Sequence, residues 1–245
     1  MNIKTKKIRV SNLTVNIIRK EIKNIHLGVY PPQGSIRVSA PLETSNDKIR
    51  LLVISKLPWI KKQQKKFLNQ KRQEKRKYVS GESHYLFGNK CRLKTINSTS
   101  IPKVVIKNKT TLELYISKKS SVKKRNLVFD KFYRKELEKI IPNLVKKWEK
   151  NVGVTANDIR VKKMKTRWGS CNIEDKRVWL NLELAKKPRR CIGYVLLHEL
   201  IHLIERNHSE KFIDILESIM PNWISIKDEL NMYPLSHANW NCFVR

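Results

Sequence analysis

Apolar and polar residues alternate through the first part of the chain. Apolar positions recur with a period of two in residues 8–17, 25–29 and 36–38, and a Pro-Pro-Gln-Gly run at residues 31–34 separates the last two segments. A period of two directs every second side chain to the same face of a strand. The pattern predicts a small antiparallel sheet with one buried face.

A helical period replaces this alternation after residue 45. Ser45 or Asn46 is suited to cap the helix, and Pro58 interrupts or restarts it, because proline fits the first turn of a helix. The continuation, residues 59–78, holds nine lysines and arginines and one glutamate. We expect a basic helix across about residues 46–78, whose lysines are the first candidates for contacts with phosphate groups.

Strands and then a long helix are expected in the middle of the chain. Short apolar runs in residues 84–96 and 104–116 are interrupted by Gly-Asn and Asn-Lys pairs, which favour turns. Apolar residues at helical spacing then predict a helix over about residues 120–150, kinked at Pro142. His84 is expected to be a surface histidine on its strand.

A hairpin and an apolar helix are predicted toward the C-terminal end. Residues 159–161 and 178–180 have the composition of strands, and we expect residues 177–181 to form a sheet edge that binds a substrate as an extra strand. The helix begins at Pro188 and is apolar on nearly every side, which is typical of a helix at the centre of its domain. Asn207 is expected to end it.

The residues with the most specific chemistry lie on this apolar helix. His198, Glu199 and His202 form a HExxH motif, and His208 follows after five intervening residues. Side chains four positions apart lie one above the other on a helix, so the two histidines of the motif face a single ion. Catalytic zinc takes three protein ligands and a water molecule, whose proton a neighbouring carboxylate accepts. We expect Zn²⁺ on the three histidines and Glu199 as the general base.

Other residues could supply the third metal ligand in place of His208. Glu210 or Asp214 would give a site of the gluzincin type, but both follow the motif closely. Cys171 would give a site like that of peptide deformylase, whose glycine-rich and EGCLS-type motifs the chain lacks. The three-histidine spacing also occurs in metzincins, which have glycine where Glu205 stands, and in an rRNA-maturation family without the glutamate. The presence of Glu199 favours peptide hydrolysis.

Composition indicates a globular protein with no membrane segment. The chain of 245 residues is 40% hydrophobic and 30% charged, and no apolar run reaches the length of a membrane span. Its first residues lack the apolar stretch of a secretory signal. The four cysteines form no CxxC pair, so we expect reduced thiols and a cytoplasmic location. The cysteines are Cys91, Cys171, Cys191 and Cys242. The sequence does not indicate the oligomeric state of the protein.

Positive charge is concentrated in front of the HExxH motif. The formal net charge is +32; residues 1–150 hold 38 basic and 10 acidic side chains, whereas residues 151–245 hold 15 and 11. Such an excess attracts polyanions, nucleic acid above all. A solvated surface rich in lysine gives the same composition. Charge reversal at Lys61, Lys62, Lys65 and Lys66 is expected to weaken nucleic-acid binding.

Several separate motifs, in order along nearly the whole chain, resemble those of the YgjP-like metallopeptidases, relatives of the SprT-like zinc peptidases. They are Tyr78–Tyr85, Met164–Cys171, Trp179–Leu182, the HExxH run with Asn207 and His208, and Pro221–Trp223. The resemblance implies an α+β zincin-type catalytic core with zinc on the three histidines and Glu199 as general base. We place this core at residues 119–245, after a basic, β-rich N-terminal region at residues 1–118.

The resulting hypothesis is a zinc metallopeptidase that hydrolyses protein or peptide substrates. SprT-like relatives act on proteins bound to DNA, and the basic N-terminal half would suit such substrates. The alternative hypothesis is a nucleic-acid-binding or RNA-processing metal protein that uses the same three histidines. His237, Tyr233 and Arg167 are candidates for stabilising an oxyanion, and Glu205 and Asp214 for orienting the imidazoles.

Overall fold

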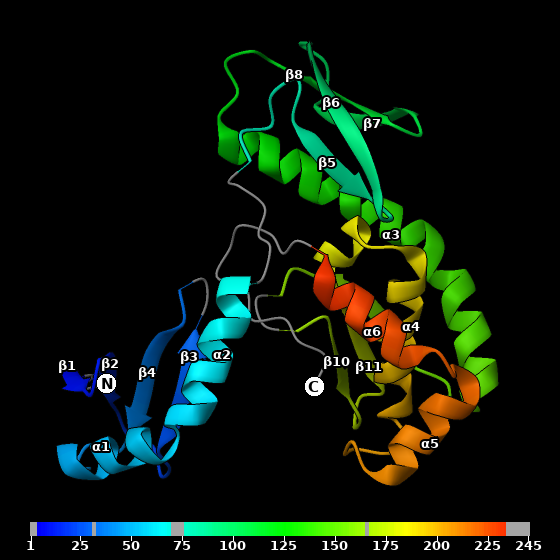
Figure 1. Cartoon of the computed structure of the whole chain (residues 1–245). Coiled ribbons are helices and arrows are strands. Elements are labelled where there is room, and N and C mark those ends of the chain that lie inside the picture. The colour runs from blue at the N-terminus through cyan, green and yellow to red at the C-terminus, as the bar shows by residue number, and fades with distance from the viewer. Residues whose placement is uncertain (1–3, 31–32, 70–75, 165–166, 234–245) are drawn as a thin grey trace. The chain divides into compact units, whose positions relative to one another are not determined.

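The described residues of the computed structural model are 4–30, 33–69, 76–164 and 167–233. They form two compact units, which we call the first unit (residues 4–69) and the second unit (residues 76–233). Figure 1 shows three small sheets with helices packed beside them. The chain is therefore of mixed α+β class, as the sequence predicted. The expected division into an N-terminal region at residues 1–118 and a catalytic core at residues 119–245 stays a prediction.

A four-stranded sheet organises the first unit. Its order is β1-β2-β4-β3. The strands are β1 (Lys4–Val10), β2 (Leu13–Arg19), β3 (His26–Tyr30) and β4 (Ser35–Ala40). The outer pairs are antiparallel, but β2 and β4 are parallel. The prediction of a purely antiparallel sheet is thus wrong for the central pair, because the segment between β2 and β3 carries the chain across the sheet.

Two helices cover one face of this sheet. They are α1 (Asn46–Ser55), which Ser45 caps by accepting a hydrogen bond from the Lys48 amide, and α2 (Leu57–Asn69). Ile49 and Ile60 are fully buried against the sheet. The restart at Pro58 is confirmed. The expected continuation to residue 78 is not observed: residues 76–79 are not helical, and residues 70–75 lie outside the described part.

The second unit begins with a sheet of the same strand order, β5-β6-β8-β7, again with a parallel central pair. Its strands are β5 (Ser83–Leu86), β6 (Asn89–Asn97), β7 (Lys103–Asn108) and β8 (Thr111–Ile116). The long helix α3 (Val122–Val152) follows and continues through Pro142. Ser121 caps it, and Gly153 ends it with a left-handed φ of 74°.

Aromatic side chains fill the interface between this sheet and α3. Phe129 and Tyr133 of the helix are buried, and the His84 ring stacks on Phe129 with 4.5 Å between centroids. His84 is only 3% exposed, so its expected surface position is wrong. Strand alternation turns this histidine toward the helix, where aromatic neighbours accommodate its ring.

A three-stranded sheet and four helical segments complete the second unit. The strands are β9 (Asp158–Lys162), β10 (Gly169–Asn172) and β11 (Arg177–Asn181), in the order β10-β11-β9. The predicted hairpin is β10–β11. The expectation that residues 177–181 form a sheet edge is wrong, because β11 pairs with β10 on one side and with β9 on the other, so those two are the edge strands.

The helical segments are η1 (Leu182–Lys186), α4 (Arg189–Ile201), α5 (Glu210–Ile219) and α6 (Trp223–Met232). Residues 191–201 of α4 are all buried, which confirms the prediction of a central helix. This helix ends at Ile201 rather than at Asn207, because the next amides bond in tight turns to Leu200 and Ile201. No helix in the described ranges is long and apolar enough to cross a membrane.

Candidate metal centre

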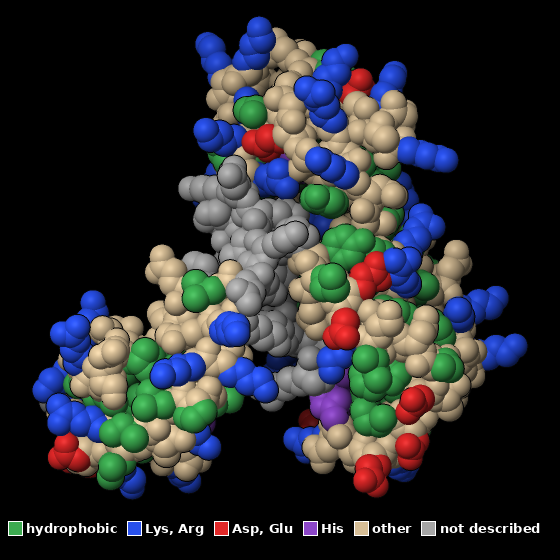
Figure 2. Space-filling model, viewed as in Figure 1, with side chains coloured by type: hydrophobic (Ala, Val, Ile, Leu, Met, Phe, Trp, Pro, Cys, Tyr) green, Lys and Arg blue, Asp and Glu red, His purple; other side chains and the backbone are tan. Residues whose placement is uncertain are grey.

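Three histidines converge at the C-terminal end of α4. His198 lies in the last turn of the helix, His202 is its C-cap, and His208 stands in the loop before α5. One ring nitrogen from each lies within 4.8 Å of the others, and the three ring centroids are 4.8–4.9 Å apart. Histidine side chains reach the surface of the second unit in Figure 2. The described residues thus bring together the three ligands expected from the sequence.

A phenylalanine that the sequence did not single out supports this group. The Phe212 ring of α5 is fully buried and lies 4.8–5.0 Å from each of the three imidazole centroids. Ser209 caps α5 by accepting a hydrogen bond from the Phe212 amide, at 3.4 Å. The capped helix therefore fixes the apolar wall against which the imidazoles pack.

The ring nitrogens of the three histidines are close enough together to bind one metal ion. Nε2 of His198 is 3.0 Å from Nε2 of His208. Two nitrogens bound tetrahedrally to zinc at about 2.0–2.1 Å are about 3.3 Å apart, so a small shift suffices. Nδ1 of His202 lies 3.0 Å from the carbonyl oxygen of Glu205, which leaves its Nε2 as the ligand atom.

Burial favours the neutral form of His198 and His202. Burial first, and then the neighbouring histidines and Lys227, lower the pKa of His198 to about 3. Burial also lowers the pKa of His202, against opposing hydrogen bonds from backbone groups. A neutral imidazole offers a lone pair to a metal, whereas a protonated one does not. The group is therefore ready to bind a cation at neutral pH.

The motif glutamate is buried beside the edge strand. Glu199 is 7% exposed, and a Cβ added to Gly169 would lie 2.6 Å from its Oε1 atom. Burial raises the pKa of Glu199 to about 8, and the charge of Arg167 opposes this rise. Gly169 is thus required for the carboxylate to occupy its place, a role that sequence spacing did not reveal.

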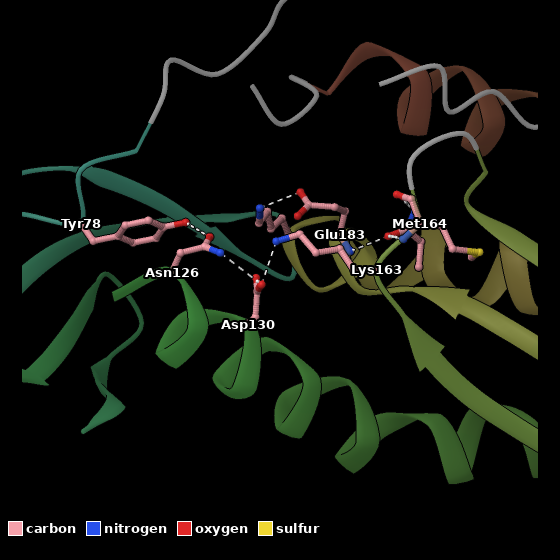
Figure 3. A network of polar contacts seen from close by, with 8 residues as sticks. Tyr78, Asn126, Asp130, Lys163, Met164 and Glu183 are labelled. Atoms are coloured by element: carbon pink, nitrogen blue, oxygen red, sulfur yellow. Dashed lines mark hydrogen bonds and ion pairs between the residues drawn. The ribbon is translucent and has the colours of Figure 1, made fainter. Parts of the chain in front are cut away.

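A network of polar contacts holds the loop in front of Gly169 (Figure 3). Asp130 of α3 accepts hydrogen bonds from Asn126 and, at 2.7 Å, from Lys163. The fully buried Asn181 donates to the carbonyl oxygens of Met164 and Arg167, at 3.0 and 2.6 Å. The backbone on both sides of residues 165–166 is therefore tied to β11 and α3.

The other predicted site residues have different surroundings. Tyr233 lies near Lys187 and hydrogen-bonds Glu229. Glu205 does orient His202, but through its backbone carbonyl rather than its carboxylate. Asp214, Glu210 and Cys171 are not part of the metal-binding group found among the described residues. His237 lies outside those residues.

Cys171 stands on β10 close to the site without joining it. Burial, and secondly the charge of Glu199, raise the pKa of its thiol to about 12. A thiol must lose its proton to bind a metal, so this side chain is held in its non-binding form. Cys91, Cys171 and Cys191 are free thiols, and Cys242 lies outside the described residues.

The fold and the histidine group point to the class of metal-dependent hydrolases. A family model described as "YgjP-like, metallopeptidase domain" matches residues 23–233. The chain therefore belongs to the YgjP-like metallopeptidase family, and the resemblance found in its motifs is confirmed. Membership implies a bound metal, typically zinc, and a peptidase activity.

Two further comparisons complete the picture. No curated protein matches the chain. Among solved structures, the crystal structure of the metallopeptidase zymogen abylysin from Pyrococcus abyssi is 20% identical over 37% of this chain and 90% of that chain, with a TM-score of 0.35.

Proposed function

We propose that this protein is a zinc-dependent peptidase that uses His198, His202 and His208 as metal ligands and Glu199 as general base. The observation that carries the proposal is the meeting of three imidazoles and one buried carboxylate within a single turn of α4 and the loop after it. The spacing of the ring nitrogens suits zinc, which takes three protein ligands in catalytic sites.

Each residue has a defined task in this proposal. The bound cation would polarise a substrate carbonyl and increase the acidity of a water molecule. Glu199 accepts the proton of the attacking water and delivers it to the nitrogen of the leaving amine. A pKa near 8 suits both steps, because an efficient general acid–base has a pKa close to the working pH. His202 keeps its orientation through the Glu205 carbonyl.

The substrate is proposed to be a polypeptide in extended conformation. Strand β10 pairs only with β11 among the described strands, so its other edge offers main-chain groups to a peptide. Binding through main-chain hydrogen bonds accepts varied side chains. Arg167 is exposed just before this strand and is the candidate for stabilising the oxyanion.

We further propose that the substrates are proteins associated with nucleic acid. The charge of the first unit supports this: residues 4–69 contain 15 lysines and arginines but only three aspartates and glutamates. In Figure 2, Lys and Arg side chains spread over its visible face. A basic surface of this kind attracts nucleic acid.

The test is casein digestion by the zinc-loaded full-length protein and its Glu199→Gln variant. Loss of a general base is expected to slow digestion by about 10²–10⁴-fold, while the zinc content stays unchanged. Glu217→Gln is the matched control, because that carboxylate is exposed on α5 and is not part of the histidine group. Equal digestion by Glu199→Gln and the wild type would reject the proposed role, and a metal-dependent cleavage of RNA that survives the change would favour the alternative hypothesis.

A further inference from the structure

The first unit has a sheet face that neither of its two described helices covers. Residues Val15, Ile17, Ile36 and Val38 are buried under α1 and α2. Their sequence neighbours point to the opposite side, because side chains alternate along a strand. On that side a cross-strand row joins Lys7, Asn16, Arg37 and Gly28. We call this side the open face.

Tyr30 lies flat on the open face. A Cβ added to Gly28 would be 2.7–2.9 Å from three atoms of the Tyr30 side chain. The Tyr30 side chain therefore lies directly over the strand backbone at Gly28. The guanidinium of Arg37 is 4.8 Å from the ring centroid. Tyr30 remains 36% exposed. Glycine weakens a strand interior and often marks the close approach of another group, and here that group is an exposed aromatic ring.

Charge on the open face has one sign. Its outward positions on the four strands are Thr5, Lys7, Arg9, Thr14, Asn16, Ile18, His26, Gly28, Tyr30, Ser35, Arg37 and Ser39. This set of twelve contains three cationic side chains, five small polar residues and no carboxylate. Lys7, Arg9 and Arg37 are all exposed. The face therefore combines an aromatic ring, a planar guanidinium and uncompensated positive charge.

We propose that the open face binds single-stranded nucleic acid, with Tyr30 and Arg37 stacking on bases and Lys7 and Arg9 contacting phosphates. Aromatic rings and guanidinium planes are the groups on which unpaired bases stack, and a positively charged surface follows the backbone. The inference rests on the proposed nucleic-acid partner and gives it a site, which differs from the α2 lysines that the sequence favoured.

Two other partners fit the open face less well. The bases of a duplex are stacked on each other and leave no face for Tyr30, so a duplex would use only the charges. An acidic protein could pair with the same cations, but the Tyr30 ring with the Arg37 guanidinium near it would add nothing to its binding. The combination of stacking groups and cations favours a single strand.

The test is fluorescence anisotropy of a labelled mixed-sequence oligonucleotide with the full-length protein. We expect Tyr30→Ala to weaken binding about tenfold and Tyr30→Phe to restore it, because stacking needs the ring but not the hydroxyl. Arg9→Gln with Arg37→Gln is expected to weaken binding about tenfold. The matched control, Lys48→Gln with Lys56→Gln at α1, removes the same charge from exposed positions away from the open face and is expected to change affinity less than about twofold.

Each outcome decides the proposal. Wild-type affinity in Tyr30→Ala, or an equal loss in the α1 control, would overturn it, as would tighter binding of a duplex or of polyglutamate. The arginine variants replace exposed side chains, so they keep the test valid if Tyr30→Ala is unstable. The assay does not involve Glu199, so its failure is distinct from a failure of the peptidase proposal, which casein digestion tests.

Discussion

The two four-stranded sheets share one strand order but pack against different helices through different side chains. The β1–β4 sheet has an aliphatic core under two short helices, whereas the β5–β8 sheet packs aromatic rings under the long helix α3. The turn of the β5–β6 hairpin also contacts η1 and the start of α4. The Phe87 amide donates a hydrogen bond to the carbonyl oxygen of Ala185 in η1, and Gly88 lies against Pro188, which precedes α4. The second sheet is thus joined to the elements that carry the histidines.

Their outer faces differ as well. The open face of the first sheet carries cations without a carboxylate, but the outer face of the second includes Glu113, which accepts a hydrogen bond from Tyr115 while Lys103 lies over that ring. The same strand order therefore supports the metal centre in one unit and, in the other, forms an outer face whose cations have no carboxylate among them. The comparison predicts that changes in one unit leave the activity of the other intact.

The largest effect is expected from metal removal. Chelation should reduce casein digestion to the level without enzyme, because the water and the carbonyl lose their activation. It should also lower the melting temperature, since a metal that binds only the folded state stabilises it. Oligonucleotide binding should be unchanged. Equal loss of both activities on chelation would contradict the separation of the two units.

A smaller effect is expected from Gly169→Ala. The added methyl group would displace the Glu199 carboxylate, and such displacement of a catalytic group costs about 10- to 100-fold in rate. Casein digestion with zinc content as a control measures it. In a Glu199→Asp background, whose shorter side chain leaves room, the methyl group should add little further loss. Full activity of Gly169→Ala would show that the carboxylate position does not matter.

The pH dependence of stability should differ between the two sheet cores. Burial first, with the cations Arg76 and Lys186, lowers the pKa of His84 from 6.5 to about 3, although Glu82 lies 3.3 Å away. Between these values only the unfolded chain binds the proton, so stability falls as pH decreases below 6.5. The loss is about 2 kcal/mol at pH 5. Urea unfolding of wild type and His84→Phe measures it, and an identical pH dependence in both would refute the assignment.

The smallest effect is expected from Gly28→Ala on the first sheet. The methyl group would push the Tyr30 ring away from the strand and weaken oligonucleotide binding about threefold, a fraction of one stacking contact. Casein digestion should be unchanged. An affinity equal to that of the wild type would show that the flat position of Tyr30 is not used.

The elements predicted correctly are those with strong local signals. Ser45 and Pro58 mark helix starts where the sequence placed them, and the HExxH spacing brought His198 and His202 together. Local chemistry decides such features, because capping residues and proline act within a few positions.

The features missed depend on contacts between distant segments. Periodicity cannot show that β2 and β4 run parallel or that β11 is central, because strand pairing is set by the whole chain. His84 is a polar residue and was therefore expected at the surface, but it shares the face of Leu86 on its strand, which α3 covers. Gly169 and Phe212 gave no signal of their role, since each acts only through a side chain far along the sequence.

Zinc content by elemental analysis tests the central claim most directly. The full-length protein, purified with added zinc and dialysed, should hold one zinc ion per chain. The His202→Ala variant should hold almost none under the same treatment, while Glu217→Gln keeps the ion. A chain without zinc, or a zinc content that is the same in His202→Ala, would contradict the three-histidine site on which the peptidase proposal depends.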